Sequence, residues 1–166
     1  MTRPVPVLFL DVDGPLLPFG GARPAPSSAD ADNPLLPRLD AGLGPRLLSL
    51  GCDLVWATTW QDEANEVVAP RLGLPALPVV RWPEDPDGTG PPGTPRGLHW
   101  KTPALAAWAG DRPFLWVDDE IGPVDRLWVE GVHPAPALLH RVDPRRGLTG
   151  GDLAVLAAFV GGLGAA

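Results

Sequence analysis

Three short apolar runs, each followed at once by acidic or hydroxyl side chains, restrict the folds that this chain of 166 residues can adopt. The runs cover residues 5–10, 53–58 and 113–119. Each is almost entirely apolar instead of alternating with polar residues, which is typical of strands buried on both faces of a parallel sheet. We therefore expect three strands, each of which ends in polar groups at its carboxyl end.

Segments of helical composition separate these runs, and we expect helices over residues 39–50, 61–72, 103–108 and 153–160. Thr149 and Asp152, three residues apart, fit the start of the last helix. Two further short strands are expected over residues 77–80 and 137–141. Strands that alternate with helices indicate an α/β fold with a mainly parallel sheet.

The composition bounds the organisation of the chain. Its length suits one domain over residues 1–166 that buries a single core. The 20 glycines and 23 prolines gather near residues 18–37 and 83–97, which we interpret as loops inserted into that domain. We expect the tryptophans, Trp60 included, to pack mainly in the core.

Charge and cysteine content argue against several classes of protein. The net charge of −7 argues against a broad surface for nucleic acid or anionic membrane. The single cysteine, Cys52, excludes an intramolecular disulfide and a multi-cysteine zinc site, and the three histidines are too scattered to propose a zinc site. No apolar run reaches membrane-spanning length, and the first residues do not read as a signal peptide. We expect a soluble cytoplasmic protein.

Polar residues follow three of the predicted strands, at the point where each strand ends. They are Asp11 and Asp13, Thr58 and Thr59, and Asp118 and Asp119. Parallel α/β sheets bind their ligands at the carboxyl ends of the strands, so we expect these groups to meet at one edge of the sheet.

The chemistry of this edge favours a metal ion and a phosphoryl group. Asp11 and Asp13 would project to the same side of a strand, and their repulsion must be offset by a turn, a metal ion or a shared proton. Several carboxylates at one edge favour Mg²⁺. A carboxylate can also act as a nucleophile, and a second one as general acid and base. Lys101, the only lysine, lies just before a predicted helix. Its positive charge and N–H donors are of the kind that binds phosphoryl oxygens.

Four motifs occur in a fixed order: DVDG at 11–14, VWATT at 55–59, Lys101, and WVDD at 116–119. This order resembles the haloacid dehalogenase (HAD) superfamily, and the resemblance covers almost the entire chain. The stretch WATTWQDEAN at 56–65 is similar to the HAD domains of Swiss Army Knife RNA repair proteins. The resemblance implies a Rossmann-like three-layer sandwich. The connections after the first two motifs look too short for a large cap domain.

The resemblance also implies catalytic roles. Asp11 would be the nucleophile and Asp13 the general acid and base. Thr58 would hydrogen-bond the phosphoryl group, and Lys101 would neutralise it. Thr59 is the alternative to Thr58, which we prefer as the first threonine after the apolar run.

The same resemblance implies a Mg²⁺ site. Asp11 and the backbone carbonyl of Asp13 would touch the metal, Asp119 would be a direct ligand, and Asp118 would support it through water or neighbouring contacts. Within the superfamily, the second aspartate of the first motif accompanies phosphate chemistry, whereas dehalogenases lack it. Taken singly, the Asp-Gly pair would equally suit a turn, and the acidic pair would suit the start of a helix.

We therefore predict a Mg²⁺-dependent phosphatase that hydrolyses a phosphomonoester through an aspartyl-phosphate intermediate. Its partner would be a phosphorylated small molecule or an exposed phosphate end, without a membrane, and net charge does not favour nucleic acid. One alternative is a phosphatase acting on nucleic-acid ends, which a basic strip from Arg71, Arg81 and Arg96 would favour. The other is a non-catalytic HAD-like binding module that uses the acidic edge for recognition.

Overall fold

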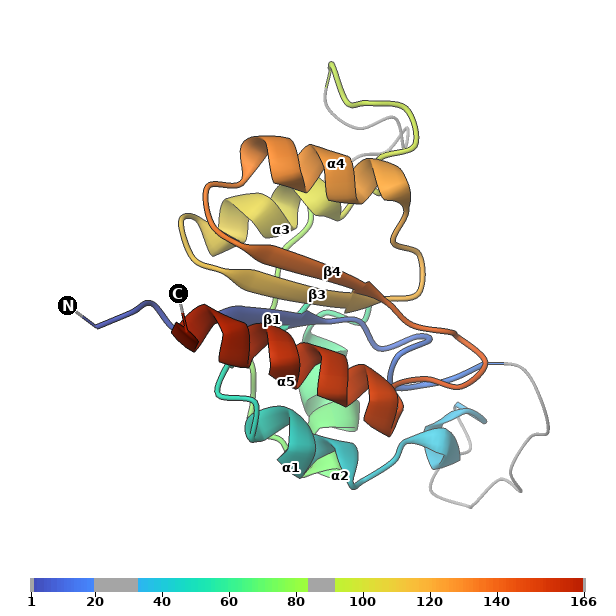
Figure 1. Cartoon of the computed structure of the whole chain (residues 1–166). Helices are drawn as coiled ribbons and strands as arrows, with labels where there is room; N and C mark the ends of the chain where they lie inside the picture. The colour runs from blue at the N-terminus through green and yellow to red at the C-terminus, as the bar shows by residue number, and fades with distance from the viewer. Residues whose placement is uncertain (1, 20–32, 84–91, 166) are drawn as a thin grey trace.

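Four parallel strands form the centre of the fold. The computed structural model describes residues 2–19, 33–83 and 92–165. The strands are β1 (Val7–Leu10), β2 (Asp53–Trp56), β3 (Phe114–Asp118) and β4 (Ala137–Arg141). They pair in the order β2-β1-β3-β4, and every pairing is parallel (Figure 1). The three apolar runs therefore contain strands, and the predicted α/β fold is confirmed.

Helices cover both faces of this sheet. They are α1 (Leu43–Leu48), α2 (Ala69–Leu72), α3 (Thr102–Ala109), α4 (Pro123–Val132) and α5 (Gly150–Ala165). A 3-10 turn at Leu36–Arg38 and a π-helical segment at Ala64–Val68 complete the regular structure of the described residues. Figure 1 shows α3 and α4 on one face, and α1, α2 and α5 on the other.

The alternation of side chains along β1 divides the core into two clusters. Leu8 and Leu10 are buried in the cluster that contains Leu47 of α1 and Leu156 of α5. Val7 and Phe9 are buried in the other cluster, together with residues of α3 and α4. The sheet is thus apolar on both faces, which explains why its strands read as continuous apolar runs. This arrangement is the predicted three-layer sandwich.

Helix α1 is shorter than the helix expected over residues 39–50. Gly44 within it allows α1 to pack closely against α2. A Cβ atom at Gly44 would lie 1.7 Å from the backbone oxygen of Leu72. Only glycine permits this approach between α1 and α2. The residue that weakens the helix by propensity therefore lets the helix pack.

Proline alters the segment predicted as a helix over residues 61–72. The backbone N–H of Ala69 donates to the carbonyl of Ala64, which is the wide spacing of a π-helix. Pro70 follows directly and begins the last helical turn. A proline ring clashes with the carbonyl four residues earlier in an α-helix, and the wider π turn relieves that clash.

One predicted strand is absent, and one observed helix was not predicted. Residues 77–80 do not form a strand, because Val79 makes only an isolated bridge to Trp56 at the end of β2. Helix α4 was not predicted at all. In this helix the apolar side chain of Leu127 is 69% exposed, whereas the acidic side chain of Asp125 is buried.

Helix α5 extends beyond the predicted range of 153–160, but it begins as the sequence indicates. The Thr149 hydroxyl donates to Asp152 Oδ2 at 2.8 Å, and the Asp152 backbone N–H donates back to Thr149 Oγ1 at 3.2 Å. His140 of β4 also contacts Asp152 through Nε2, at 2.8 Å from Oδ1. Asp152 therefore ties the start of α5 to the edge of the sheet.

The connections after β1 and β2 hold no second folded unit within the described residues, which form only short helical segments and loops there. Residues 20–32 and 84–91, the greater part of the loops expected at 18–37 and 83–97, lie outside the described residues. None of the described helices is long and apolar enough to cross a membrane.

The Asp152 contacts predict a pH-dependent stability. Burial acts to raise the pKa of Asp152, but hydrogen bonds from Thr149 and His140 outweigh it and lower the pKa. We expect Asp152→Ala to reduce the free energy of unfolding at pH 7 by about 1 kcal/mol. The pKa of Asp152 is lower in the folded protein than in the unfolded chain, where it is about 3.9. The stabilisation is therefore complete above the unfolded pKa, and it is lost as the pH falls through the folded pKa.

Urea denaturation of wild type and variant between pH 3 and pH 7 measures this difference. Asp111→Ala, at an exposed aspartate, is the control. A difference between wild type and Asp152→Ala that stays constant down to pH 3 would contradict the assignment.

Candidate active site

The register of the sheet brings acidic residues from two strands side by side. Leu10 at the end of β1 pairs with Trp56 of β2 and with Val117 of β3. The next backbone N–H, that of Asp11, donates to the carbonyl of Val117 at 3.1 Å. Asp11 and Asp118 therefore emerge together at the carboxyl edge of the sheet, as predicted.

Lys101 lies between these two carboxylates. Its Nζ is 3.2 Å from Asp11 Oδ1 and 2.8 Å from Asp118 Oδ2. The Lys101 side chain is only 5% exposed. A buried ammonium is tolerated only when it is paired and hydrogen-bonded, and here two carboxylates satisfy it. The sequence prediction that Lys101 joins the acidic residues agrees with this geometry.

Burial and charge shift the titration of the cluster. Burial raises the pKa of Asp11 to about 7; the Lys101 charge opposes this shift, and the Asp118 charge adds to it. Burial and the charge of Asp118 raise the pKa of Asp119 to about 6. For Lys101, burial acts to lower the pKa, but the charges of Asp11 and Asp118 outweigh it, so the pKa is raised. Burial therefore disfavours the charged form of Asp11 and Asp119 even with Lys101 in place.

The donor set fits a hard divalent cation. Carboxylate oxygens of Asp11, Asp118 and Asp119 all lie within 4.8 Å of one another. Oxygen donors of this kind suit Mg²⁺, and a bound cation would stabilise the charged form of Asp11 and Asp119, which burial disfavours. The predicted metal residues Asp11, Asp118 and Asp119 are therefore brought together, and Asp13 lies two residues from Asp11 on the same loop.

Gly14 lets this loop close against Asp119. Its φ is +99°, and a Cβ atom there would lie 2.8 Å from Asp119 Cγ. The backbone N–H of Gly14 donates to the carbonyl of Leu17 at 2.9 Å, which closes a turn. The Asp-Gly pair is therefore both a turn and part of the acidic cluster.

A cavity of about 200 Å³ opens over the cluster. Its lining residues are Asp11, Asp13, Phe19, Thr59, Trp100, Lys101, Asp119 and Glu120. Asp13 is partly buried, and its Oδ2 accepts a hydrogen bond from Trp60 Nε1 at 3.1 Å. A larger cavity of about 870 Å³ lies at the opposite edge of the sheet, lined mainly by prolines, glycines and apolar side chains.

The two candidate threonines occupy different positions. Thr58 is fully buried, and its Oγ1 accepts a hydrogen bond from the Trp60 backbone N–H at 3.2 Å. Its carbonyl accepts another from Trp82 Nε1 at 3.2 Å. Thr59 is exposed and lines the cavity. Thr58 is not among the described residues that line the cavity, and its predicted contact with phosphate stays a prediction.

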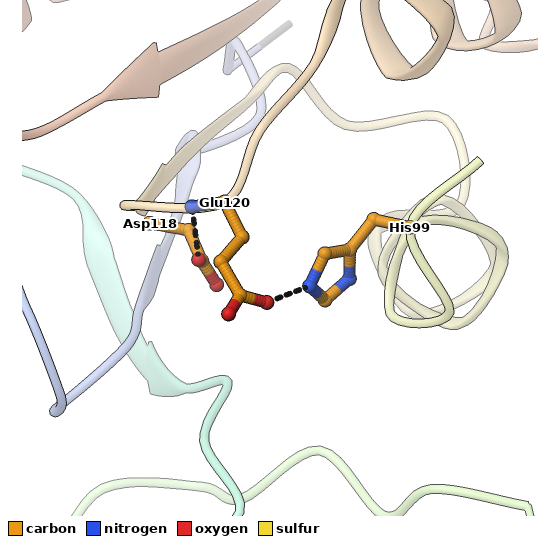
Figure 2. A group of neighbouring side chains, drawn as sticks. All are labelled: His99, Asp118 and Glu120. Atoms are coloured by element: carbon orange, nitrogen blue, oxygen red, sulfur yellow. Dashed lines mark hydrogen bonds and ion pairs between the residues drawn. The ribbon is translucent and has the colours of Figure 1, made fainter. Parts of the chain in front are cut away.

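His99 belongs to the site, although its sequence context gave no sign of this. Figure 2 shows Glu120 between Asp118 and the His99 ring, with His99 Nε2 3.0 Å from Glu120 Oε2. His99 Nδ1 accepts a hydrogen bond from the Lys101 backbone N–H at 3.1 Å. The ring proton must therefore lie on Nε2, which donates to Glu120. In this hydrogen-bonded arrangement, His99 orients the Glu120 carboxylate.

Asp125 holds the segment that carries Lys101. Its carboxylate accepts hydrogen bonds from the His99 backbone N–H at 2.8 Å and from the Thr102 hydroxyl at 2.6 Å. The other oxygen accepts from the Gly122 backbone N–H at 2.8 Å, at the start of α4. The Gly-Pro-x-Asp pattern at 122–125 is a sequence signal for this cap.

The arginines proposed as a basic strip are not among the described residues that line the cavity, and whether they flank it stays a prediction. Arg81 pairs with the Asp62 carboxylate at 2.6 Å, and both side chains are exposed. Neither Arg81 nor Arg71 nor Arg96 is among the described residues that line the cavity.

Comparison with known protein families identifies a relationship over most of the chain. A family model described as the HAD domain in Swiss Army Knife RNA repair proteins matches residues 7–153. This range includes every residue of the acidic cluster and Lys101. No curated protein and no solved structure matches the chain.

Gly14 provides a test of the geometry around Asp119. Gly14→Ala and Gly51→Ala both place alanine at a positive φ, and each should lower the free energy of unfolding by about 1 kcal/mol. Only Gly14→Ala also displaces a carboxylate, because the Cβ of residue 51 would meet no atom within 4 Å. We expect Gly14→Ala to weaken Mg²⁺ binding at least about tenfold by titration calorimetry. Equal Mg²⁺ affinities in the two variants would contradict the site.

Proposed function

The chain belongs to the family of HAD domains found in Swiss Army Knife RNA repair proteins, and from this premise we propose that it is a Mg²⁺-dependent phosphatase. It would hydrolyse a phosphomonoester through an aspartyl-phosphate intermediate. The observation that carries the proposal is the buried Lys101, paired with Asp11 and Asp118 beneath a small acidic cavity.

The first half of the reaction forms the covalent intermediate. A carboxylate oxygen of Asp11 attacks phosphorus, and the bond between phosphorus and the leaving oxygen breaks. The leaving oxygen keeps the electron pair and takes a proton from the Asp13 carboxyl group. The Lys101 ammonium stabilises the negative charge of the phosphoryl oxygens, and Thr58 or Thr59 donates a hydrogen bond to them.

The second half releases phosphate. Asp13, now a carboxylate, takes a proton from a water molecule, whose oxygen attacks phosphorus. The bond between phosphorus and Asp11 breaks, and its electron pair returns to the Asp11 carboxylate. Both side chains are thus restored.

The acidic cluster would hold the metal. In this account Asp11, Asp119 and the backbone carbonyl of Asp13 hold Mg²⁺, with support from Asp118. When bound, Mg²⁺ supplies positive charge that stabilises the phosphoryl oxygens in the transition state. The oxygen donors within 4.8 Å of one another and the raised pKa values of Asp11 and Asp119 support this assignment.

The size of the cavity bears on the substrate. Its volume of about 200 Å³ is below the roughly 300–1,000 Å³ of cavities that enclose whole ligands. It therefore suits the phosphate group, while the rest of the substrate remains outside. This favours an exposed phosphate end or a small phosphomonoester.

Asp11 provides the direct test of catalysis. We expect wild type to release phosphate from a panel of aryl, sugar, nucleotide and oligonucleotide phosphates with Mg²⁺ but not with EDTA. Asp11→Asn removes the nucleophile and should lower kcat on the order of 10⁴-fold. Asp111→Asn, at an exposed aspartate beside the opposite edge of the sheet, is the matched control. Mg²⁺ binding without release from any panel member would favour the binding module instead.

Exposed aromatic rings at the cavity favour a second candidate, a phosphatase of nucleic-acid ends. Trp100 is 49% exposed and Phe19 43% exposed, and both line the cavity. Trp100 is held by Trp82, with ring centroids 4.9 Å apart, and by a stacked contact with His99 at 5.5 Å. Fixed, exposed aromatic rings are stacking platforms for nucleobases, and they do not require a basic surface.

Trp100→Ala tests this second candidate. Loss of stacking should raise KM for a phosphorylated oligonucleotide by roughly 10- to 100-fold, and leave KM for a sugar phosphate nearly unchanged. Trp108→Ala, at a 39% exposed tryptophan that is not among the cavity's lining residues, is the control. Equal changes for both substrates would argue against recognition of a nucleobase.

A further inference from the structure

Trp60 links the second motif to the first. Its indole Nε1 donates a hydrogen bond to Asp13 Oδ2 at 3.1 Å, across 47 residues of sequence. We propose that Trp60 is a positioning residue for Asp13, which it holds in place for proton transfer to the leaving oxygen. The inference rests on the phosphatase activity proposed above, since it concerns the acid in that reaction.

The backbone around Trp60 fixes the direction of its ring. The Trp60 N–H donates to Thr58 Oγ1 at 3.2 Å, and its carbonyl accepts from the Glu63 N–H at 3.1 Å. The next residue, Gln61, has a φ of +50° and is the one non-glycine residue with positive φ in the described part of the chain. Such a conformation is unfavourable for glutamine and is maintained only by its surroundings. The chain therefore makes a strained turn directly after Trp60.

The chemistry of the indole suits this role. Its N–H is neutral and only donates, so it does not compete with Asp13 for a proton. The indole holds one carboxyl oxygen, and the other remains available to carry the proton. A neutral hydrogen-bond donor thus fixes the orientation of the Asp13 carboxyl group.

The role predicts a dependence on the leaving group. An alkyl phosphate expels a strongly basic oxygen, which must be protonated as the bond breaks. A p-nitrophenyl phosphate expels a weakly basic oxygen, which needs little help from an acid. Loss of Asp13 positioning should therefore impair the alkyl substrate far more than the aryl substrate.

Steady-state kinetics of Trp60→Phe, which keeps an aromatic ring and removes the N–H, tests this inference. We expect kcat for glycerol phosphate to fall at least about tenfold more than kcat for p-nitrophenyl phosphate, with little change in KM. Asp13→Asn should show the same dependence, with a larger loss. Trp56→Phe removes an indole hydrogen bond to Asn65 of 2.8 Å and should affect both substrates equally.

A second measurement needs neither metal nor substrate. In ¹⁵N-labelled, metal-free protein, Asp13→Ala should shift the indole N–H resonance of Trp60 and leave that of Trp108 unchanged. An unmoved Trp60 resonance overturns the inference, as do equal losses of kcat for both substrates in Trp60→Phe. If wild type hydrolyses neither substrate, the proposed phosphatase fails, and the catalytic role of Trp60 fails with it.

Discussion

The buried Lys101 ammonium, paired with Asp11 and Asp118, is the interaction on which the carboxyl edge of the sheet depends. Each carboxylate comes from a different strand, and the lysine comes from the start of α3. A charge buried without these partners would cost several kcal/mol. The three groups meet only if β1 and β3 pair in the observed register and α3 packs against the sheet.

Neighbouring residues support this interaction from several directions. Asp125 at the start of α4 binds the backbone at His99 and the hydroxyl of Thr102, on either side of Lys101. Gly14 allows the loop after β1 to approach Asp119. Burial is the main cause of the raised pKa values of Asp11 and Asp119, with a smaller contribution from the Asp118 charge, and a bound cation would stabilise the charged form of both carboxylates.

The parts of the site that follow from local pattern were predictable from sequence. Continuous apolar runs such as residues 5–10 indicate buried parallel strands, and parallel strands end at one edge. This reasoning brought Asp11 and Asp118 together, whereas Lys101 was assigned from its place before a predicted helix and from the family resemblance. Thr58 and Thr59 differ in burial, which the sequence did not reveal.

Other features depend on contacts between distant segments. The bond from Trp60 to Asp13 spans 47 residues, and no local periodicity encodes it. Helix α4 was not predicted, although the Gly-Pro-x-Asp pattern at 122–125 marks its start, and its buried Asp125 is explained only by bonds to His99 and Thr102. His99 contacts Glu120 through Nε2. The hydrogen bond from the Lys101 backbone N–H to Nδ1 places the ring proton on Nε2, and the sequence gives no sign of that bond.

Chemical trapping of the covalent intermediate tests the central claim most directly. Borohydride added during turnover of a phosphomonoester reduces an aspartyl-phosphate to homoserine, which peptide mass spectrometry locates. The account predicts homoserine at position 11 and at no other aspartate. Phosphate release that proceeds while Asp11 remains unmodified, or homoserine at another position, would contradict it.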